Sequence, residues 1–87
     1  MASRFIVYGR ESCPWCVRAI NFLNILRQEK VFLNMEEDRE GLEEAKAFYN
    51  WRTVPMIVEN DLDTGEVKFI GGYDSLKERF PESWKMI

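Results

Sequence analysis

Apolar residues along this chain recur at spacings that switch between those of strands and those of helices. Residues 4–8 (Arg-Phe-Ile-Val-Tyr) are rich in β-branched and aromatic side chains and stop at Gly9, which predicts a short buried strand. In the next segment the apolar positions have helical spacing, at Cys16, Ala19, Ile20 and Leu23. This spacing predicts a helix over residues 14–27, with Ser12 as its N-cap and Pro14 in its first turn.

The middle of the chain repeats the strand-then-helix pattern once. Residues 31–35 (Val-Phe-Leu-Asn-Met) have the composition of a second strand. Asp38 can cap a helix that runs to about residue 50 and carries Leu42, Ala45 and Tyr49 on its inner face. Strands connected through helices in this way require parallel crossovers.

The pattern then changes to that of a hairpin. Residues 55–59 (Pro-Met-Ile-Val-Glu) and residues 66–70 have strand composition, and the polar segment 60–65 between them predicts a turn. The pair Gly71-Gly72 follows residue 70 and ends the second of these strands.

A last helix is expected after the glycine pair. Asp74 or Ser75 can begin it, Ser75 and Glu78 have the spacing of a capping box, and Pro81 ends it. The predicted order is β-α-β-α-β-β-α, an α/β fold with a four-stranded mixed sheet and helices on both faces. There is no repeat or linker, so residues 1–87 are expected to form a single domain.

Composition and charge narrow the functions that are open to the chain. Its 87 residues are 46% hydrophobic and 31% charged, which suits one globular domain. Twelve Lys and Arg against 15 Asp and Glu give a net charge of -3, which argues against nucleic-acid binding. The chain has no His, so catalysis by a His base and metal binding by His are excluded within it. The main candidates for chemistry are therefore the two cysteines, Cys13 and Cys16.

The sequence also predicts where the protein is found. No apolar stretch approaches the ~18 residues of a membrane span, and no signal-peptide cleavage pattern is recognisable at the start. Two cysteines allow at most one disulfide, whereas small secreted domains usually carry several. We expect a cytoplasmic monomer with no membrane partner.

The motif with the most chemical content is the C-x-x-C sequence Cys13-Pro14-Trp15-Cys16, at the junction of the first strand and the first helix. Unpaired N–H groups and the dipole at a helix start favour an anion, and Arg10 adds a positive charge, so the thiolate of Cys13 is favoured. Cys16 falls nearly one turn later, on the inward face. This asymmetry suits a nucleophilic thiol, Cys13, and a resolving thiol, Cys16.

Two other interpretations of the cysteines are open. A zinc half-site would need carboxylates or a second chain, because zinc prefers four nitrogen or sulfur ligands and the chain has no His. Alternatively, both cysteines are small hydrophobic residues of the core, which suits Cys16 better than Cys13 beside Pro14.

Three motifs together resemble a family, namely Tyr8-Gly9-Arg10-Glu11-Ser12-Cys13-Pro14-Trp15-Cys16, Arg52-Thr53-Val54-Pro55 and Ile70-Gly71-Gly72-Tyr73-Asp74-Ser75-Leu76. In this order they resemble a dithiol glutaredoxin of the short phage or bacterial type, over nearly the whole chain. The resemblance implies a thioredoxin fold, no bound cofactor or metal, and glutathione as co-substrate. It also implies reduction of protein disulfides and glutathione mixed disulfides, with ribonucleotide reductase among the family's protein clients.

The resemblance further implies a glutathione site made of Arg10, Trp15, Arg52, Thr53, Val54, Pro55, Gly72, Tyr73 and Asp74. A cis peptide is expected before Pro55, and the Val54 backbone would pair with the cysteinyl part of glutathione as an added strand. Tyr73 and Asp74 would contact the γ-glutamyl end, and either arginine would pair with the glycyl carboxylate. Gly72 would permit close approach of the ligand.

Structural roles remain open for several of these residues. Asp74 could serve only as a helix cap, and the two arginines could be ordinary surface charges. Trp15 replaces the family's usual Tyr, so it either contacts substrate or covers the core. Ser75 stands where many members have a second Asp, which would weaken the contact to the γ-glutamyl end.

Three other functions are compatible with the motif. The first is a redoxin that is reduced by thioredoxin reductase. The segment from Gly71 to Asp74 argues against this function, because it resembles the glutathione-binding version of the motif. The second is an iron–sulfur module in which two chains hold a cluster through Cys13 and glutathione thiols; Pro14 argues against it, because cluster-binding relatives generally have a smaller residue there. The third is a non-catalytic interaction domain.

Overall fold

The computed structural model describes residues 2–84 and contains one four-stranded sheet in the order β2-β1-β3-β4. The central strands are β1 (Ser3–Gly9) and β3 (Met56–Asp61), which run antiparallel to each other. Strand β2 (Glu29–Asn34) pairs in parallel with β1, and β4 (Val67–Gly71) pairs antiparallel with β3. The mixed sheet predicted from the sequence is therefore confirmed.

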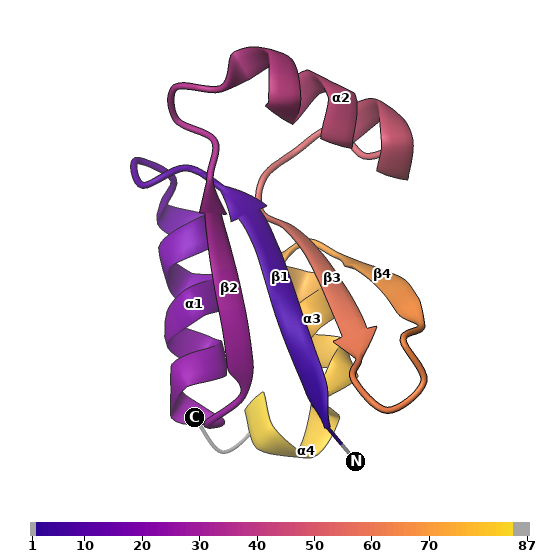
Figure 1. Cartoon of the computed structure of the whole chain (residues 1–87). Helices are drawn as coiled ribbons and strands as arrows, with labels where there is room; N and C mark the ends of the chain where they lie inside the picture. The colour runs from indigo at the N-terminus through magenta and orange to yellow at the C-terminus, as the bar shows by residue number, and fades with distance from the viewer. Residues whose placement is uncertain (1, 85–87) are drawn as a thin grey trace.

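Helices connect and cover the strands (Figure 1). They are α1 (Pro14–Ile25), α2 (Arg39–Tyr49), α3 (Tyr73–Arg79) and a short α4 (Pro81–Trp84). Up to α3 the order is the expected β-α-β-α-β-β-α, which is the order of the thioredoxin fold; α4 is an addition that the sequence pattern did not predict. The longest helix has 12 residues, so within residues 2–84 no helix reaches the length and hydropathy of a membrane span.

The core lies between the sheet and the pair α1 and α3. Alternate residues of β1 point into it, because successive side chains of a strand face opposite sides of the sheet. Its buried members are Phe5, Val7, Ala19, Phe22, Leu23, Ile57 and Leu76. These side chains hold α1 and α3 against the same sheet face.

Helix α2 lies beyond the carboxyl ends of β1 and β2 (Figure 1). Its last residue, Tyr49, stacks on Phe69 at 5.1 Å between ring centroids and contacts the Tyr8 ring at 5.8 Å, on the second face of the sheet. Val31 and Leu33 of β2 remain 39% and 37% exposed. The second face is thus covered mainly at the end where α2 sits.

Two predicted helix starts can be compared with the structure. The Asp38 cap of α2 is confirmed, since its carboxylate accepts a hydrogen bond from the Gly41 N–H at 2.9 Å. The predicted start of α3 is wrong: Gly72 is the N-cap, and no side chain caps this helix. Because Gly71 has a φ of +124°, the chain turns into the helix early, and Ser75 falls inside the first turn rather than at the cap.

Helix α3 is tied to the sheet by one ion pair. The Arg79 guanidinium donates two hydrogen bonds to the Glu59 carboxylate of β3, at 2.8 and 2.9 Å. This pairing holds the pKa of Glu59 below its ordinary value of 4.5, because the charged form accepts both bonds. The pair therefore fixes the far end of the helix whose first turn faces the site described below.

We predict that Glu59→Gln lowers the free energy of unfolding by about 1 kcal/mol at pH 7, the size of a well-formed but partly solvated pair. Because the folded-state pKa is depressed, the stabilisation is present above pH 4.5 and is lost as the pH falls through the folded-state value. Urea unfolding of both proteins should show a difference that shrinks between pH 7 and pH values below 4.5. A difference that stays constant over this range would contradict the assignment.

Candidate active site

Cys13 begins helix α1 as its N-cap. Its backbone is extended, with φ -91° and ψ 112°, and its sulfur accepts a hydrogen bond from the Cys16 N–H at 3.3 Å. The predicted cap, Ser12, is wrong by one residue. The thiol sulfur itself takes the place that a capping oxygen usually occupies, so an N–H of the first helical turn points at the reactive atom.

Cys16 is the buried member of the pair. It is 1% exposed, and burial, followed by its hydrogen bond with Cys13, raises its thiol pKa from 9.0 to about 12. Gly9 leaves space for its sulfur, because a Cβ at that position would lie 2.5 Å from Cys16 Sγ. Cys13 is only half-buried. The two thiols therefore differ in access to solvent, as the sequence predicts.

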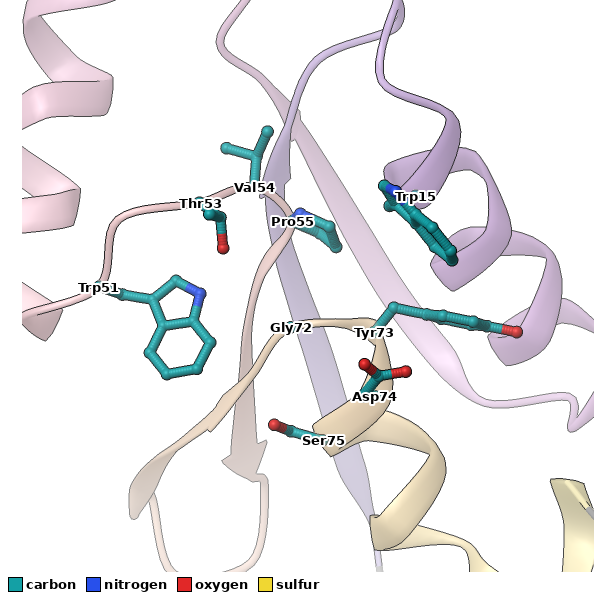
Figure 2. Close-up of a pocket in the computed structure, with 9 residues that line it drawn as sticks. All are labelled: Trp15, Trp51, Thr53, Val54, Pro55, Gly72, Tyr73, Asp74 and Ser75. Atoms are coloured by element: carbon teal, nitrogen blue, oxygen red, sulfur yellow. The ribbon is translucent and has the colours of Figure 1, made fainter.

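The segment that faces the dithiol comes from the loop before β3. The Val54–Pro55 peptide is cis, as the resemblance implies. The Cys13 thiol lies 3.8 Å from the Val54 carbonyl oxygen, to which it can donate a long hydrogen bond. This contact joins the dithiol to a groove of about 500 Å³, shown in Figure 2 and lined by Trp15, Trp51, Thr53, Val54, Pro55, Gly72, Tyr73, Asp74 and Ser75.

Seven of the residues predicted for ligand binding meet in this groove, and two do not line it. The seven are Trp15, Thr53, Val54, Pro55, Gly72, Tyr73 and Asp74. Arg10 lines a separate pocket of about 240 Å³ together with Cys16 and Phe32. Arg52 is exposed beside the groove. The roles of both arginines remain predictions.

One wall of the groove is aromatic and cationic. The Trp15 ring is 51% exposed and lies 5.9 Å from the Tyr73 ring, with the Arg18 guanidinium 4.5 Å above it. The Lys77 ammonium lies 5.0 Å from the Tyr73 ring. Trp15 is thus a groove residue rather than a covered core residue, which makes it available for stacking on a bound peptide.

Two groove residues were not in the predicted site: Ser75, which was noted only as a departure from the family pattern, and Trp51. The indole ring of Trp51 contacts Phe69 at 5.3 Å, and its Nε1 is buried with no hydrogen-bond partner among the described residues. An unpaired buried donor costs on the order of 1–3 kcal/mol. The only signal in the sequence was its position directly before Arg52-Thr53-Val54-Pro55, and a tryptophan there is just as compatible with simple packing.

Metal binding has no structural support in the part of the chain that is described. Within residues 2–84 no group of three or more Cys, Asp or Glu side chains is placed to hold a metal ion. The chemistry that the arrangement supports is that of sulfur: an accessible thiol at a helix start, a buried thiol one turn later, and an open groove beside them. These features define a dithiol redox site on a thioredoxin fold.

Comparison with known proteins identifies the family. The family model described as Glutaredoxin matches residues 5–62, and the chain therefore belongs to the glutaredoxin family. A dithiolic glutaredoxin from Trypanosoma brucei brucei is 30% identical, with a TM-score of 0.70 over 90% of this chain and 77% of that one. The protein is accordingly a thiol–disulfide oxidoreductase. A search of curated proteins returns no match.

Two plant structures show the same fold at lower identity. Wheat glutaredoxin is 20% identical, with a TM-score of 0.74 over 92% of this chain and 71% of that chain. A buckwheat glutaredoxin–glutathione complex is 22% identical, with a TM-score of 0.69 over 97% of this chain and 76% of that chain.

We predict that alkylation of the reduced protein separates the two thiols. At pH 7, iodoacetamide should modify Cys13 and leave Cys16 unmodified, because Cys16 is 1% exposed and its pKa of about 12 leaves almost no thiolate. Peptide mapping by mass spectrometry after short exposures measures both rates. The Cys13→Ser variant is the control, in which the remaining thiol should react only after urea unfolding. Equal rates at the two cysteines of the folded protein would refute the asymmetry.

Proposed function

We propose that the protein is a glutathione-dependent oxidoreductase that reduces protein disulfides and glutathione mixed disulfides through Cys13 and Cys16. One observation carries this proposal: the Cys13 sulfur caps helix α1 and also lies 3.8 Å from the Val54 carbonyl at the edge of an open groove. A ligand disulfide bound along this groove would present its sulfur to Cys13. The buried Cys16 thiol would then be available for the next step of the reaction.

The reaction on a protein disulfide follows from this arrangement. The Cys13 thiolate attacks one sulfur of the client, forms a mixed disulfide with it and releases the other sulfur as a thiolate. Cys16 loses its proton, attacks Cys13 Sγ and releases the second client thiolate, which leaves a Cys13–Cys16 disulfide. One glutathione thiolate then opens this disulfide by forming a mixed disulfide on Cys13. A second glutathione thiolate then attacks the sulfur of the first and releases the Cys13 thiolate, which gives oxidised glutathione and the reduced enzyme.

The backbone before Pro55 is suited to hold the tripeptide. Val54 lies in a bend two residues before β3, so its backbone groups could pair with the cysteinyl residue in the manner of an added strand. Support comes from the groove beside Cys13 and from the buckwheat relative, whose structure is a glutathione complex. We assign the γ-glutamyl end to Tyr73 and Asp74, and the glycyl carboxylate to Arg10 or Arg52.

The reductant and the clients belong to the same proposal. Turnover coupled to glutathione and glutathione reductase should be fast, and turnover coupled to thioredoxin reductase should stay at background. The opposite result would instead favour a redoxin that is reduced by thioredoxin reductase. Ribonucleotide reductase, one of the family's clients, is a candidate client within this proposal.

We predict that the two cysteine variants fail in different ways. Cys13→Ser should abolish reduction of every substrate, since it removes the attacking sulfur. Cys16→Ser should accumulate mixed disulfides with protein clients yet still reduce glutathione adducts, because free glutathione can resolve those. Non-reducing gels and a glutathionylated peptide assay measure the two activities. If both variants behave alike on both substrates, the division of roles is wrong.

We predict that Asp74→Ala weakens the use of glutathione. The Asp74 carboxylate is exposed at the groove, 3.7 Å from the Lys77 ammonium, and it caps no helix, since Gly72 is the N-cap without a side-chain bond. Loss of one hydrogen bond to a ligand ammonium should raise KM for glutathione roughly three- to tenfold. The rate of Cys13 alkylation should not change. Glu78→Ala, an exposed carboxylate on the same helix but outside the groove, is the matched control; equal effects of the two variants would assign Asp74 to surface charge alone.

A further inference from the structure

Trp51 has an indole N–H that the protein itself leaves without an acceptor. Nε1 is buried and is the one buried side-chain nitrogen or oxygen within the described residues that has no hydrogen-bond partner. The same indole ring forms part of the groove wall. In Figure 2 the nitrogen is directed from the ring toward the space bounded by Pro55 and Gly72.

The position of this donor is set by its neighbours. The Trp51 N–H of the main chain donates to the Lys46 carbonyl at 3.0 Å, directly after Asn50 ends α2 with a φ of +53°. The indole packs at an angle of 65° against the Phe69 ring. Its six-membered ring lies against the glycine pair, since a Cβ at Gly71 would stand 3.5 Å from Trp51 Cη2. The main chain of Trp51 is therefore fixed by a hydrogen bond, and its indole ring is fixed by packing contacts.

The chemistry of the donor defines what could pair with it. An indole nitrogen donates and never accepts, so its partner must carry a lone pair, as a carbonyl or carboxylate oxygen does. A tripeptide in the groove supplies several such oxygens, whereas a small aliphatic thiol supplies none. Buried donors are nearly always paired, so a ligand oxygen at this point would satisfy the one group that the described protein leaves open.

We propose that Trp51 is a specificity residue whose Nε1–H donates a hydrogen bond to a carbonyl or carboxylate oxygen of bound glutathione. This inference rests on the proposed function and deepens it. The nitrogen is covered by protein, so binding requires a small movement of the residues that line the groove. The bond would favour glutathione over thiols that lack oxygen acceptors.

The direct test compares two adducts of the Cys16→Ser protein. Cys13 is loaded by reaction with oxidised glutathione, which provides acceptors, or with cystamine, whose cysteamine half provides none. The chain has three tryptophans, and Trp51→Phe in the same background identifies the Trp51 resonance among the indole N–H signals in a ¹H–¹⁵N spectrum. We expect the Trp51 indole proton to move downfield and to exchange more slowly with solvent in the glutathione adduct only.

The kinetic test uses the enzyme with both cysteines present. Trp51→Phe keeps an aromatic ring against Phe69 and removes only the N–H, so KM for a glutathionylated peptide should rise roughly three- to tenfold with little change in kcat. The rise in KM should be smaller for a cysteamine-modified peptide, because its cysteamine half offers no oxygen acceptor to the indole. Tyr49→Phe is the matched control, because it removes one polar group from the other side of the Phe69 stack, away from the groove.

The outcomes separate this inference from the proposed function. If the Val54 amide distinguishes the glutathione adduct from the cysteamine adduct but the Trp51 indole does not, the inference is overturned and glutathione recognition stands. If Trp51→Phe and Tyr49→Phe raise KM equally, Trp51 only supports the aromatic cluster, and the inference is likewise overturned. If no groove resonance distinguishes the two adducts, glutathione recognition itself fails and the inference fails with it.

Discussion

The site depends on the hydrogen bond from a main-chain N–H in the first turn of helix α1 to the sulfur of Cys13. The donor of this bond is the main chain of Cys16, so the residue that supplies the second thiol also holds the first one in place. The helix in turn stays where it is because Ala19, Phe22 and Leu23 are buried between it and the sheet. Core packing and thiol chemistry are thus joined through one turn of helix, and a shift of α1 would change both.

The groove depends on a different set of constraints. Its floor is the loop before β3, its far side is the glycine pair that leads into α3, and its ends carry Trp15 and Trp51 (Figure 2). These segments are distant in sequence and meet because β1 and β3 are neighbours in the sheet. The dithiol agrees with membership of the glutaredoxin family, and the Trp51 indole adds to the groove the one buried side-chain donor of residues 2–84 that lacks a partner.

Much of the fold followed from local patterns. Strand and helix order, the hairpin and the Asp38 cap were all predicted, because each depends on residues close together in sequence. The errors lie at helix starts, where Cys13 and Gly72 are the caps instead of Ser12 and either Asp74 or Ser75. Capping depends on where the preceding strand delivers the chain, and the sheet decides that. For the same reason the sequence did not distinguish Arg10, which lies in a separate pocket, from the residues of the groove.

By itself the sequence determined that this chain is an α/β domain with two unequal thiols at a strand–helix junction, since spacing alone places Cys16 one turn inside the helix. Only the tertiary structure decided how unequal they are, because the burial that raises the Cys16 pKa to about 12 comes from packing against the sheet at Gly9. It also decided which side chains share the groove. An indole after α2 and a carboxylate on α3 become neighbours of one ligand site only when long-range strand pairing brings their segments together.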